Sequence, residues 1–440
     1  MGYVDLSLPE SSALVHINER ASMPPTATIY ALPTELIGEI LEAWQALDPS
    51  APESAVRVCR PWRSIALSMS TLWRVLTLDS HASAGVKVPL WHARSHGRLE
   101  HLRLVANACP KYFPIFGTLL DSVQLARLRS LECRLPEWLR YDVLGRMPLL
   151  QNLRVVISGT PLHLRWELLA GLESLQILDL VNAYPQDDRP LPFPNLRVVR
   201  LQCHEGAHLL RFLLKTCGGL PLEEAALSLR QAGDKAITHP NERDLVNLGS
   251  ARCDYLALRH LRVEGKMDWH LLTSRLYLPE LCTIVMDDFP SPSAAACFGD
   301  LRPLEAPIRS LTISTHDHLA IEEGLSILIQ LEGVPTLEHL RITGYLSDTF
   351  LDGLGEACQP NLAHIDLSGC EGVSPAAAVR LAIARIESGH PLRIITLDGC
   401  QWVTPDVIPV LQDIGPAVEY STRIAPTVPR GWRNWTFVNN

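Results

Sequence analysis

Two different spacings of apolar residues divide the chain. Between residues 30 and 78 apolar residues recur every three or four positions, the period of an amphipathic helix. A first helix is expected after Leu32-Pro33-Thr34-Glu35, because proline near the first helical position and an acid in the first turn are helix-start signals. Its apolar positions are Leu36, Ile37, Ile40, Leu41 and Trp44. After a proline-containing break at 48–52, a second helical stripe is formed by Val58, Cys59, Trp62, Ile65 and Ala66.

From residue 99 onward a shorter motif, L-x-x-L-x-L, recurs about every 27 residues, with other apolar residues replacing some of the leucines. Alternate residues of a strand point to the same face, so each motif predicts one short strand with a buried side. The paired positions expected to point inward are Leu102/Leu104, Leu131/Cys133, Leu153/Val155, Leu178/Leu180, Val199/Leu201, Leu227/Leu229, Leu261/Val263, Ile284/Met286, Leu311/Ile313, Leu340/Ile342, Ile365/Leu367 and Ile395/Leu397.

A motif with this period resembles the leucine-rich repeat. The resemblance implies an α/β solenoid, a horseshoe of about 12 repeats in which each strand is followed by a return segment and stacking buries a continuous core. Two return segments, 346–357 and 376–386, have helical patterns. Leu367-Ser368-Gly369-Cys370 and Leu397-Asp398-Gly399-Cys400 resemble the cysteine-containing class of these repeats, which implies that Cys370 and Cys400 fill buried turns.

The composition narrows the class of protein. The formal net charge is −9, which argues against a protein devoted to nucleic acid. The 11 cysteines include no C-x-x-C pair, so neither a zinc module nor a disulfide framework is expected. The sequence shows no secretory signal and no apolar stretch of membrane-spanning length. A cytoplasmic or nuclear protein that binds no membrane is therefore expected.

The N-terminal helical region resembles an F-box of the F-box-like family that is abundant in fungi. The matching elements are Leu32-Pro33-x-Glu35-Leu36-Ile37 with Ile40-Leu41, then Val58-Cys59-Arg60-x-Trp62-Arg63 with Ile65-Ala66, and then Leu72-Trp73. Pro61 departs from a continuous second helix, which we expect to kink or restart there. The expected domains are a flexible tail at 1–28, a small all-helical F-box domain at 29–80, a linker at 81–98, the leucine-rich repeat domain at 99–405, and a C-terminal cap and tail at 406–440.

The F-box resemblance implies that the protein docks on the Skp-type adaptor of a Skp–cullin–F-box ubiquitin ligase, and through it on a cullin–RING assembly. The repeats would then hold an unidentified protein client whose ubiquitin-dependent breakdown follows. The alternative is a leucine-rich repeat scaffold for protein–protein interaction with no ligase role. The residues expected to serve docking or the local core, which sequence alone does not separate, are Leu32, Pro33, Leu36, Ile37, Ile40, Val58, Trp62 and Trp73.

Between the inward residues of each motif lies one position that faces outward. Five of these positions carry arginine, namely Arg103, Arg154, Arg200, Arg262 and Arg341. One hypothesis is a stripe that binds an acidic or phosphorylated client, because guanidinium groups match carboxylate and phosphate. The alternative is that exposed strand positions simply tolerate long charged side chains. Charge reversal of Arg154, Arg200 and Arg262 would separate the two.

Sequence motifs of common enzymes are missing. The chain contains no G-x-S-x-G elbow, no phosphate-binding P-loop, no G-x-G-x-x-G before a helix and no H-E-x-x-H. We therefore expect no catalytic residue, no metal and no cofactor, and a protein that works by binding.

Overall fold

In a computed structural model of the chain, residues 32–78, 81–105, 125–134, 144–157, 162–164, 169–185, 189–204, 209, 211–229, 253–265, 275–287, 306–318, 334–356, 359–400 and 402–420 are described. The chain forms two compact units, with the division between Leu72 and Trp73. The expected tail at 1–28 lies outside the described residues.

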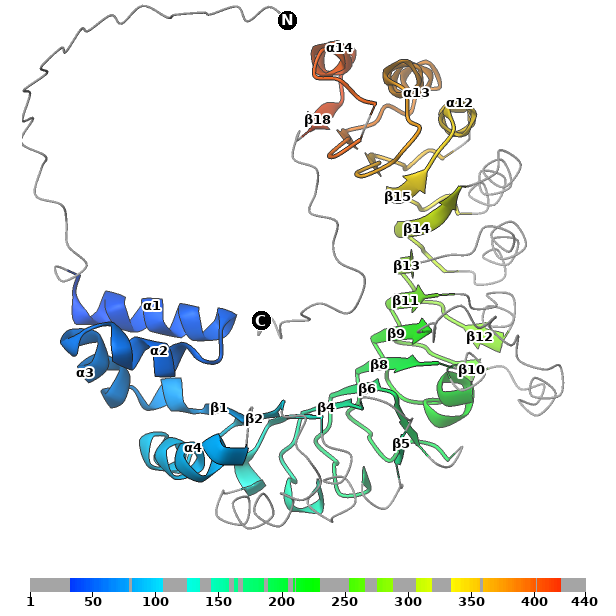
Figure 1. Cartoon of the computed structure of the whole chain (residues 1–440). Helices are drawn as coiled ribbons and strands as arrows, with labels where there is room; N and C mark the ends of the chain where they lie inside the picture. The colour runs from blue at the N-terminus through cyan, green and yellow to red at the C-terminus, as the bar shows by residue number, and fades with distance from the viewer. Residues whose placement is uncertain are drawn as a thin grey trace, which may run out of the picture. The chain divides into compact units, whose positions relative to one another are not determined.

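The N-terminal unit is helical, as the apolar period predicts (Figure 1). It contains α1 (Thr34–Leu47), α2 (Ala51–Val58) and α3 (Arg60–Ser68), followed by the 3-10 turn η2 (Ser70–Trp73). The expected second helix is interrupted at Cys59, whose backbone is extended with φ −159° and ψ 173°. Pro61 lies in the first turn of α3. Backbone N–H groups in the first turn of a helix have no acceptor within the helix, so proline, which lacks an N–H, costs no helical hydrogen bond there. The proline therefore restarts the helix.

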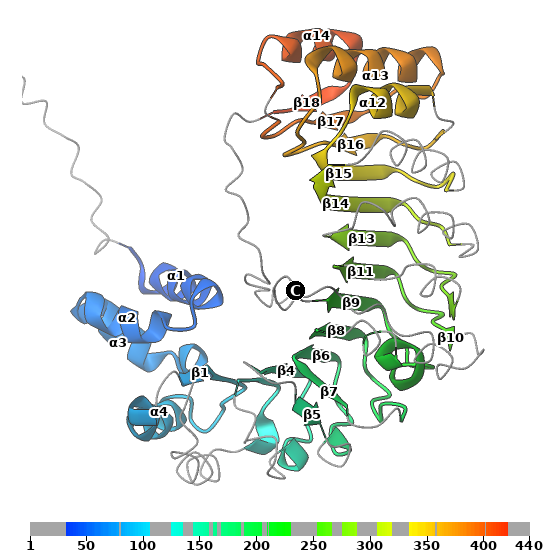
Figure 2. The ribbon, with the colours of Figure 1, turned by 45° about the vertical axis from the view of Figure 1, so that its right-hand side comes forward.

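The second unit is mixed α/β and is built on a large parallel sheet. Within the described residues the sheet has 14 strands. They are β1 (Val75–Leu78), β2 (His101–Leu104), β3 (Ser130–Cys133), β4 (Asn152–Val156), β6 (Ile177–Val181), β8 (Val198–Cys203), β9 (Glu224–Leu229), β11 (His260–Glu264), β13 (Thr283–Asp287), β14 (Ser310–His318), β15 (His339–Tyr345), β16 (His364–Asp366), β17 (Ile394–Thr396) and β18 (Ala417–Glu419). Each strand pairs with the next one in chain order, and Figure 2 shows them stacked in that sequence.

The register of the strands explains the spacing of the leucines. Leu102 pairs with Leu131, and Leu131 pairs with Leu153, so equivalent residues form rows across the sheet. These side chains are at most 2% exposed, while the residues between them point to the other face of the sheet. One strand alone could not bury its apolar side, and stacking supplies the cover.

The return segments carry the remaining elements. Two pairs of short strands, β5 (Leu162–Leu164) with β7 (Ala183–Pro185) and β10 (Cys253–Asp254) with β12 (Leu276–Tyr277), lie outside the large sheet. The return turns of several repeats are η4 (Leu125–Arg127), η6 (Leu144–Arg146) and η7 (Phe212–Thr216). Near the C-terminus they lengthen into α12 (Asp348–Glu356), α13 (Pro375–Glu387) and α14 (Val407–Ile414), which pack side by side (Figures 1 and 2). Helices were expected at 346–357 and 376–386.

The linker expected at 81–98 is instead occupied by helix α4 (His81–Arg94). Trp91 of α4 packs edge-on against Trp73, with ring centroids 4.7 Å apart, and its Nε1 donates to the carbonyl oxygen of Val75 at 2.8 Å. The helix therefore covers the first strand of the sheet. Gly85 and Pro89 lie inside α4 and hide its helical character from a sequence pattern.

Two domain boundaries and the register of one strand differ from the expected ones. Strand β1 belongs to the sheet although residues 75–78 were assigned to the F-box domain, and β18 extends the sheet past residue 405. In β9 the register differs by two residues: Ala225 and Leu227, rather than Leu227 and Leu229, pair with Val199 and Leu201. The first inward position of β9 is Ala225, which is less hydrophobic than leucine. The sequence pattern therefore favoured the pair Leu227 and Leu229.

Cys370 and Cys400 follow glycines with left-handed backbones, Gly369 at φ 72° and Gly399 at φ 69°. Each thiol is buried and donates to a carbonyl oxygen of the preceding turn of the sheet, Cys370 to Ile342 at 2.9 Å and Cys400 to Leu367 at 3.0 Å. Both cysteines therefore fill turns between strands. Among the described residues, no helix has the length and apolar character needed to cross a membrane.

Candidate functional site

Helix α1 has an inner and an outer apolar face. On the inner face Ile37 is 4% exposed and Leu41 is 1% exposed, and Gly38 lies against the thioether of Met69. Gln45 donates its side-chain amide to the carbonyl oxygen of Leu72 at 2.6 Å, which fixes the C-terminal end of the helix. This face supplies the core of the N-terminal unit.

The outer face of α1 contains a second row of apolar residues. Leu36, Ile40 and Leu47 are 45%, 41% and 80% exposed, and Ala43 between them is also exposed. Their spacing of four, three and four residues places them on one side of the helix. We call this row, Leu36, Ile40, Ala43 and Leu47, the α1 stripe. A contiguous apolar row on a surface helix is typical of a docking site.

The structure separates the residues expected to serve docking from those in the core. Leu32, Pro33, Leu36, Ile40 and Val58 are exposed, whereas Ile37, Trp62 and Trp73 are buried. Trp73 falls in the second unit, where it packs against Trp91. Ala43 and Leu47 are also exposed and continue the helical period of Leu36 and Ile40, but they were not among the residues expected to serve docking.

A second candidate surface is the face of the sheet that points away from the core. In register across it lie Arg103, Glu132, Arg154, Asp179 and Arg200, one from each of five successive strands, so the charges alternate. The row continues with Ala226, Arg262, Val285, Thr312, Arg341, Asp366 and Thr396. The expected inward pair Leu227/Leu229 would have placed Ser228 in this row, and the shifted register of β9 places Ala226 there instead.

Each of the five arginines of this row has an acidic partner on the next strand. The nitrogen-to-oxygen distances are 2.9 Å for Arg103–Glu132, 3.2 Å for Arg154–Asp179, 2.9 Å for Arg200–Glu224, 2.5 Å for Arg262–Asp287 and 3.4 Å for Arg341–Asp366. The expected arginine stripe is therefore a ladder of ion pairs. An acidic client would have to displace an internal carboxylate at every position, so the stripe is not an open cationic surface.

The ladder is most buried near its N-terminal end. The side chains of Arg154 and Asp179 are 13% and 4% exposed, whereas that of Arg341 is 52% exposed. Burial raises the pKa of Asp179 to about 6, and the opposing effect of Arg154 and Arg200 is smaller. Desolvation thus outweighs two neighbouring cations at this carboxylate.

A chain of hydrogen bonds crosses the sheet near its C-terminal end. Nε2 of His364 lies 3.0 Å from Oγ1 of Thr396, and that hydroxyl donates to Glu419 at 3.1 Å. These three side chains therefore link β16, β17 and β18 on one face of the sheet.

A third feature is the row of residues that immediately precede the strands, which we call the entry row. From β1 to β18 these residues are Arg74, Glu100, Arg129, Gln151, Gln176, Arg197, Glu223, Arg259, Cys282, Arg309, Glu338, Ala363, Arg393 and Pro416. Backbone hydrogen bonds join neighbours, for example from the nitrogen of Glu100 to the oxygen of Arg74 at 3.0 Å. Ion pairs join Arg74–Glu100 at 3.2 Å, Arg197–Glu223 at 2.5 Å and Arg309–Glu338 at 3.9 Å.

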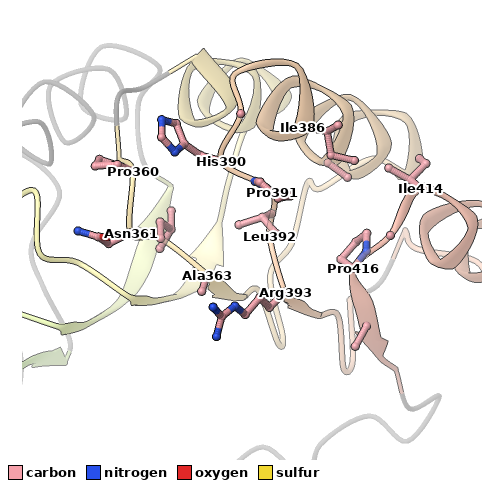
Figure 3. A pocket seen from close by; sticks show the side chains of 15 residues that line it. Pro360, Asn361, Ala363, Ile386, His390, Pro391, Leu392, Arg393, Ile414 and Pro416 are labelled. Carbon is pink, nitrogen blue, oxygen red and sulfur yellow. The ribbon is translucent and has the colours of Figure 1, made fainter.

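A pocket of about 650 Å³ lies at the C-terminal end of the entry row (Figure 3). Its lining comes from three successive turns of the chain and from α13, and includes Pro360, Ile386, His390, Arg393 and Pro416. This pocket was not expected from the sequence, because Arg393 lies outside the inward and outward positions of the strand motif.

The turn after α13 builds one wall of the pocket. Gly389 has a left-handed backbone with φ 79°, its nitrogen donates to Ile386, and the nitrogen of His390 donates to Arg385. These two bonds form the glycine-capped end known as a Schellman motif. They turn the chain so that His390 and Pro391 lead directly into the entry row.

No protein-family model and no curated protein sequence matches the chain. Among solved structures, the Rad7–Elc1 complex of yeast has a chain that aligns over 90% of this chain and 98% of its own, with 15% identity and a TM-score of 0.38. The Toll–Spätzle complex of Drosophila aligns over 73% of this chain and 43% of its own, with 15% identity and a TM-score of 0.28. Within the described residues, no cluster of three or more His, Cys, Asp or Glu side chains could hold a metal ion.

Proposed function

We propose that this chain is the substrate-recognition subunit of a Skp–cullin–F-box type ubiquitin ligase. In this proposal the N-terminal unit is an F-box that docks on a Skp-type adaptor. The second unit is a leucine-rich repeat solenoid that holds a protein client, and other subunits transfer ubiquitin. The F-box-like pattern between residues 30 and 78 and the α1 stripe together support this function.

The α1 stripe is the observation that carries the proposal. A 14-residue helix with one face in the core would ordinarily present polar residues on the other face. Here the exposed surface presents Leu36, Ile40 and Leu47 in addition to exposed glutamates. Covering a large aliphatic side chain contributes about 1.5–3 kcal/mol, so a partner that buries three of them gains several kcal/mol. An adaptor groove that receives an apolar helix face would supply that cover.

The second unit fits the role of a client holder. Its sheet is rigid because every strand is paired on at least one side, and its outward face presents polar and charged side chains. Such a surface can present many contacts to a folded or extended protein. We propose that it binds rather than catalyses, because the chemistry is assigned to other subunits.

The test is co-purification of the full chain with a recombinant Skp-type adaptor. Wild type should retain the adaptor, and Leu36→Glu/Ile40→Glu should lose it while keeping the far-ultraviolet circular dichroism of the folded chain. Leu256→Glu is the matched control, because Leu256 is 64% exposed in the second unit. Equal retention by the double variant would refute docking through the α1 stripe.

The alternative function, a leucine-rich repeat scaffold without a ligase role, gives a different result. In that case wild type fails to retain the adaptor although the N-terminal unit is folded. Capture of a client by the second unit would then persist without any adaptor.

A further inference from the structure

Arg393 differs from every other arginine of the entry row. Arg74 and Arg129 both neighbour Glu100, Arg197 and Arg259 both neighbour Glu223, and Arg309 neighbours Glu338. Arg393 instead lies between Ala363 and Pro416, with its backbone nitrogen bonded to Ala363 at 2.8 Å. Among the described residues its guanidinium has neither an ion-pair partner nor a hydrogen-bond partner.

The C-terminal carbonyl oxygens of α13 do not pair with the guanidinium of Arg393. The carbonyl oxygens of Ala384, Arg385 and Ile386, at the end of α13, accept backbone hydrogen bonds from Ser388, His390 and Gly389. A cation is often placed at a helix C-terminus to serve such carbonyls, but here they are already bonded. The guanidinium of Arg393 thus takes part in none of the described ion pairs or hydrogen bonds that stabilise the fold.

This charge lies at a pocket with an apolar floor. Leu362, Ala382 and Leu392 line the pocket and are 1%, 2% and 4% exposed, while Ile386 on the rim is 41% exposed. Figure 3 shows Ile386 approaching from α13 and the Arg393 side chain extending past Ala363, on the opposite side of Leu392. The exposed apolar group, Ile386, and the cationic group, Arg393, therefore lie at opposite sides of the pocket.

The walls of the pocket are preformed. Pro360, Pro391 and Pro416 restrict the three chain segments that cross it. Asn361 donates its side-chain amide to the carbonyl oxygen of Pro335 at 2.8 Å, as Asn195 does to Glu173 at 3.0 Å in an earlier turn. The equivalent position in the next turn is Pro391, whose side chain has no hydrogen-bond donor. The side-chain hydrogen bond to the preceding turn is therefore not repeated at the pocket. A ligand would not have to order these segments, which lowers the entropic cost of binding.

We propose that this pocket binds a segment of a protein client in which a bulky aliphatic or aromatic side chain lies within a few residues of an Asp or Glu. The apolar side chain would rest on Ile386 and Ile414, and the carboxylate would pair with Arg393. The volume of about 650 Å³ accommodates side chains rather than a folded domain. This inference rests on the proposed function as a client receptor and names the class of client segment.

The chain's own C-terminal sequence does not complement the pocket. Residues 421–440 include three arginines and no Asp or Glu. A cationic segment would repel Arg393, so charge complementarity favours an acidic partner from another protein.

The experiment selects ligands from a displayed library of random 12-residue internal peptides on the full-length chain. Wild type should enrich peptides that combine a bulky apolar residue with an acid within three positions. Arg393→Gln should abolish this enrichment, whereas Arg309→Gln, the matched change at an ion-paired entry-row arginine, should keep it. The most enriched peptide, measured by fluorescence anisotropy, should bind Arg393→Gln at least tenfold more weakly than wild type or Arg309→Gln.

Four results would overturn the inference: no enrichment by wild type, enriched peptides without acids, equal binding by Arg393→Gln, or displacement of the peptide by millimolar acetate alone. The last would mean a simple anion site without the apolar component. The outcome is separable from adaptor docking, because wild type that retains the adaptor but enriches no peptide refutes only this pocket. Wild type that enriches the peptides but binds no adaptor refutes only the ligase role.

Discussion

Oδ2 of Asp179 lies 3.2 Å from Nε of Arg154 on the preceding strand, yet burial raises the pKa of this carboxyl group to about 6. The other carboxylate oxygen, Oδ1, is buried and accepts no hydrogen bond within the described residues. An ion pair with half of its acceptor capacity unused does not recover the full cost of desolvation. This relationship makes the stability of the second unit sensitive to pH.

Asp179→Asn should remove that sensitivity. The pKa of Asp179 in the folded chain is about 6 and its ordinary value is 3.8. Between these values the folded chain retains a proton that the unfolded chain releases, so the contribution of Asp179 to stability falls as the pH rises from 4 to 6. The full effect is at most about 3 kcal/mol. Thermal melts at pH 4.5 and 7.5 should show wild type losing stability relative to Asp179→Asn as the pH rises; a constant difference would contradict the prediction.

Truncation should destabilise the chain at the inner face of α1 and have little effect at the outer face. Leu41→Ala opens a cavity in the core of the N-terminal unit and should lower its free energy of unfolding by about 2–4 kcal/mol. Ile40 precedes Leu41 in the sequence but belongs to the α1 stripe. Ile40→Ala should change the free energy of unfolding by less than about 0.5 kcal/mol. Urea unfolding followed by the fluorescence of Trp44 and Trp62 measures both. Comparable losses would mean that the stripe is part of the core.

Gly389 should tolerate alanine poorly although the space around it is open. A Cβ at Gly389 meets no atom within 4 Å, so the cost comes only from its left-handed backbone, and Gly389→Ala should destabilise by about 1–2 kcal/mol. Gly85→Ala is the control, because Gly85 has open space and an ordinary helical backbone in α4. That change should stabilise by about 0.5–1 kcal/mol. Differential scanning calorimetry would show the opposite shifts in Tm.

Cysteine labelling should distinguish buried turns from accessible thiols. Burial raises the pKa of Cys400 to about 11 and that of Cys370 well above its ordinary range, so little thiolate forms at pH 8. Cys59 and Cys282 are partly exposed. Native iodoacetamide labelling followed by peptide mass spectrometry should modify Cys59 and Cys282 at least about tenfold faster than Cys370 and Cys400. Equal rates would show that the turns open readily.

The inward positions of the sheet could be predicted because burial repeats with a fixed period. Leu102, Leu131 and Leu153 lie where the motif places them, and their side chains are buried. The pattern was misleading at β9, where Ala225 is as buried as a leucine but gives a weaker hydrophobic signal. The pattern did not predict helix α4, because Gly85 and Pro89 interrupt the helical period.

The site was harder to predict because it depends on neighbours that are distant in sequence. The outward arginines were visible, but their neutralisation by Glu224 and Asp287 depends on the register between strands. Exposed and core apolar residues in α1 share one hydrophobic period, so only burial separates Ile37 from Leu36. Arg393 becomes notable only when the entry row is aligned, because its distinction is the absence of a glutamate beside it.

The order of the strands determines how far the effect of a destabilising substitution extends along the sheet. Each strand of the large sheet bonds only to its immediate predecessor and successor in the chain. No contact within the sheet connects β2 directly to β15, so a destabilising change is felt by adjacent strands and then decays. Strands at the two ends, which lose one neighbour, should open first, and amide hydrogen exchange should slow progressively toward β8 and β9. Evolution could therefore alter one binding position at a time without rebuilding the rest of the protein.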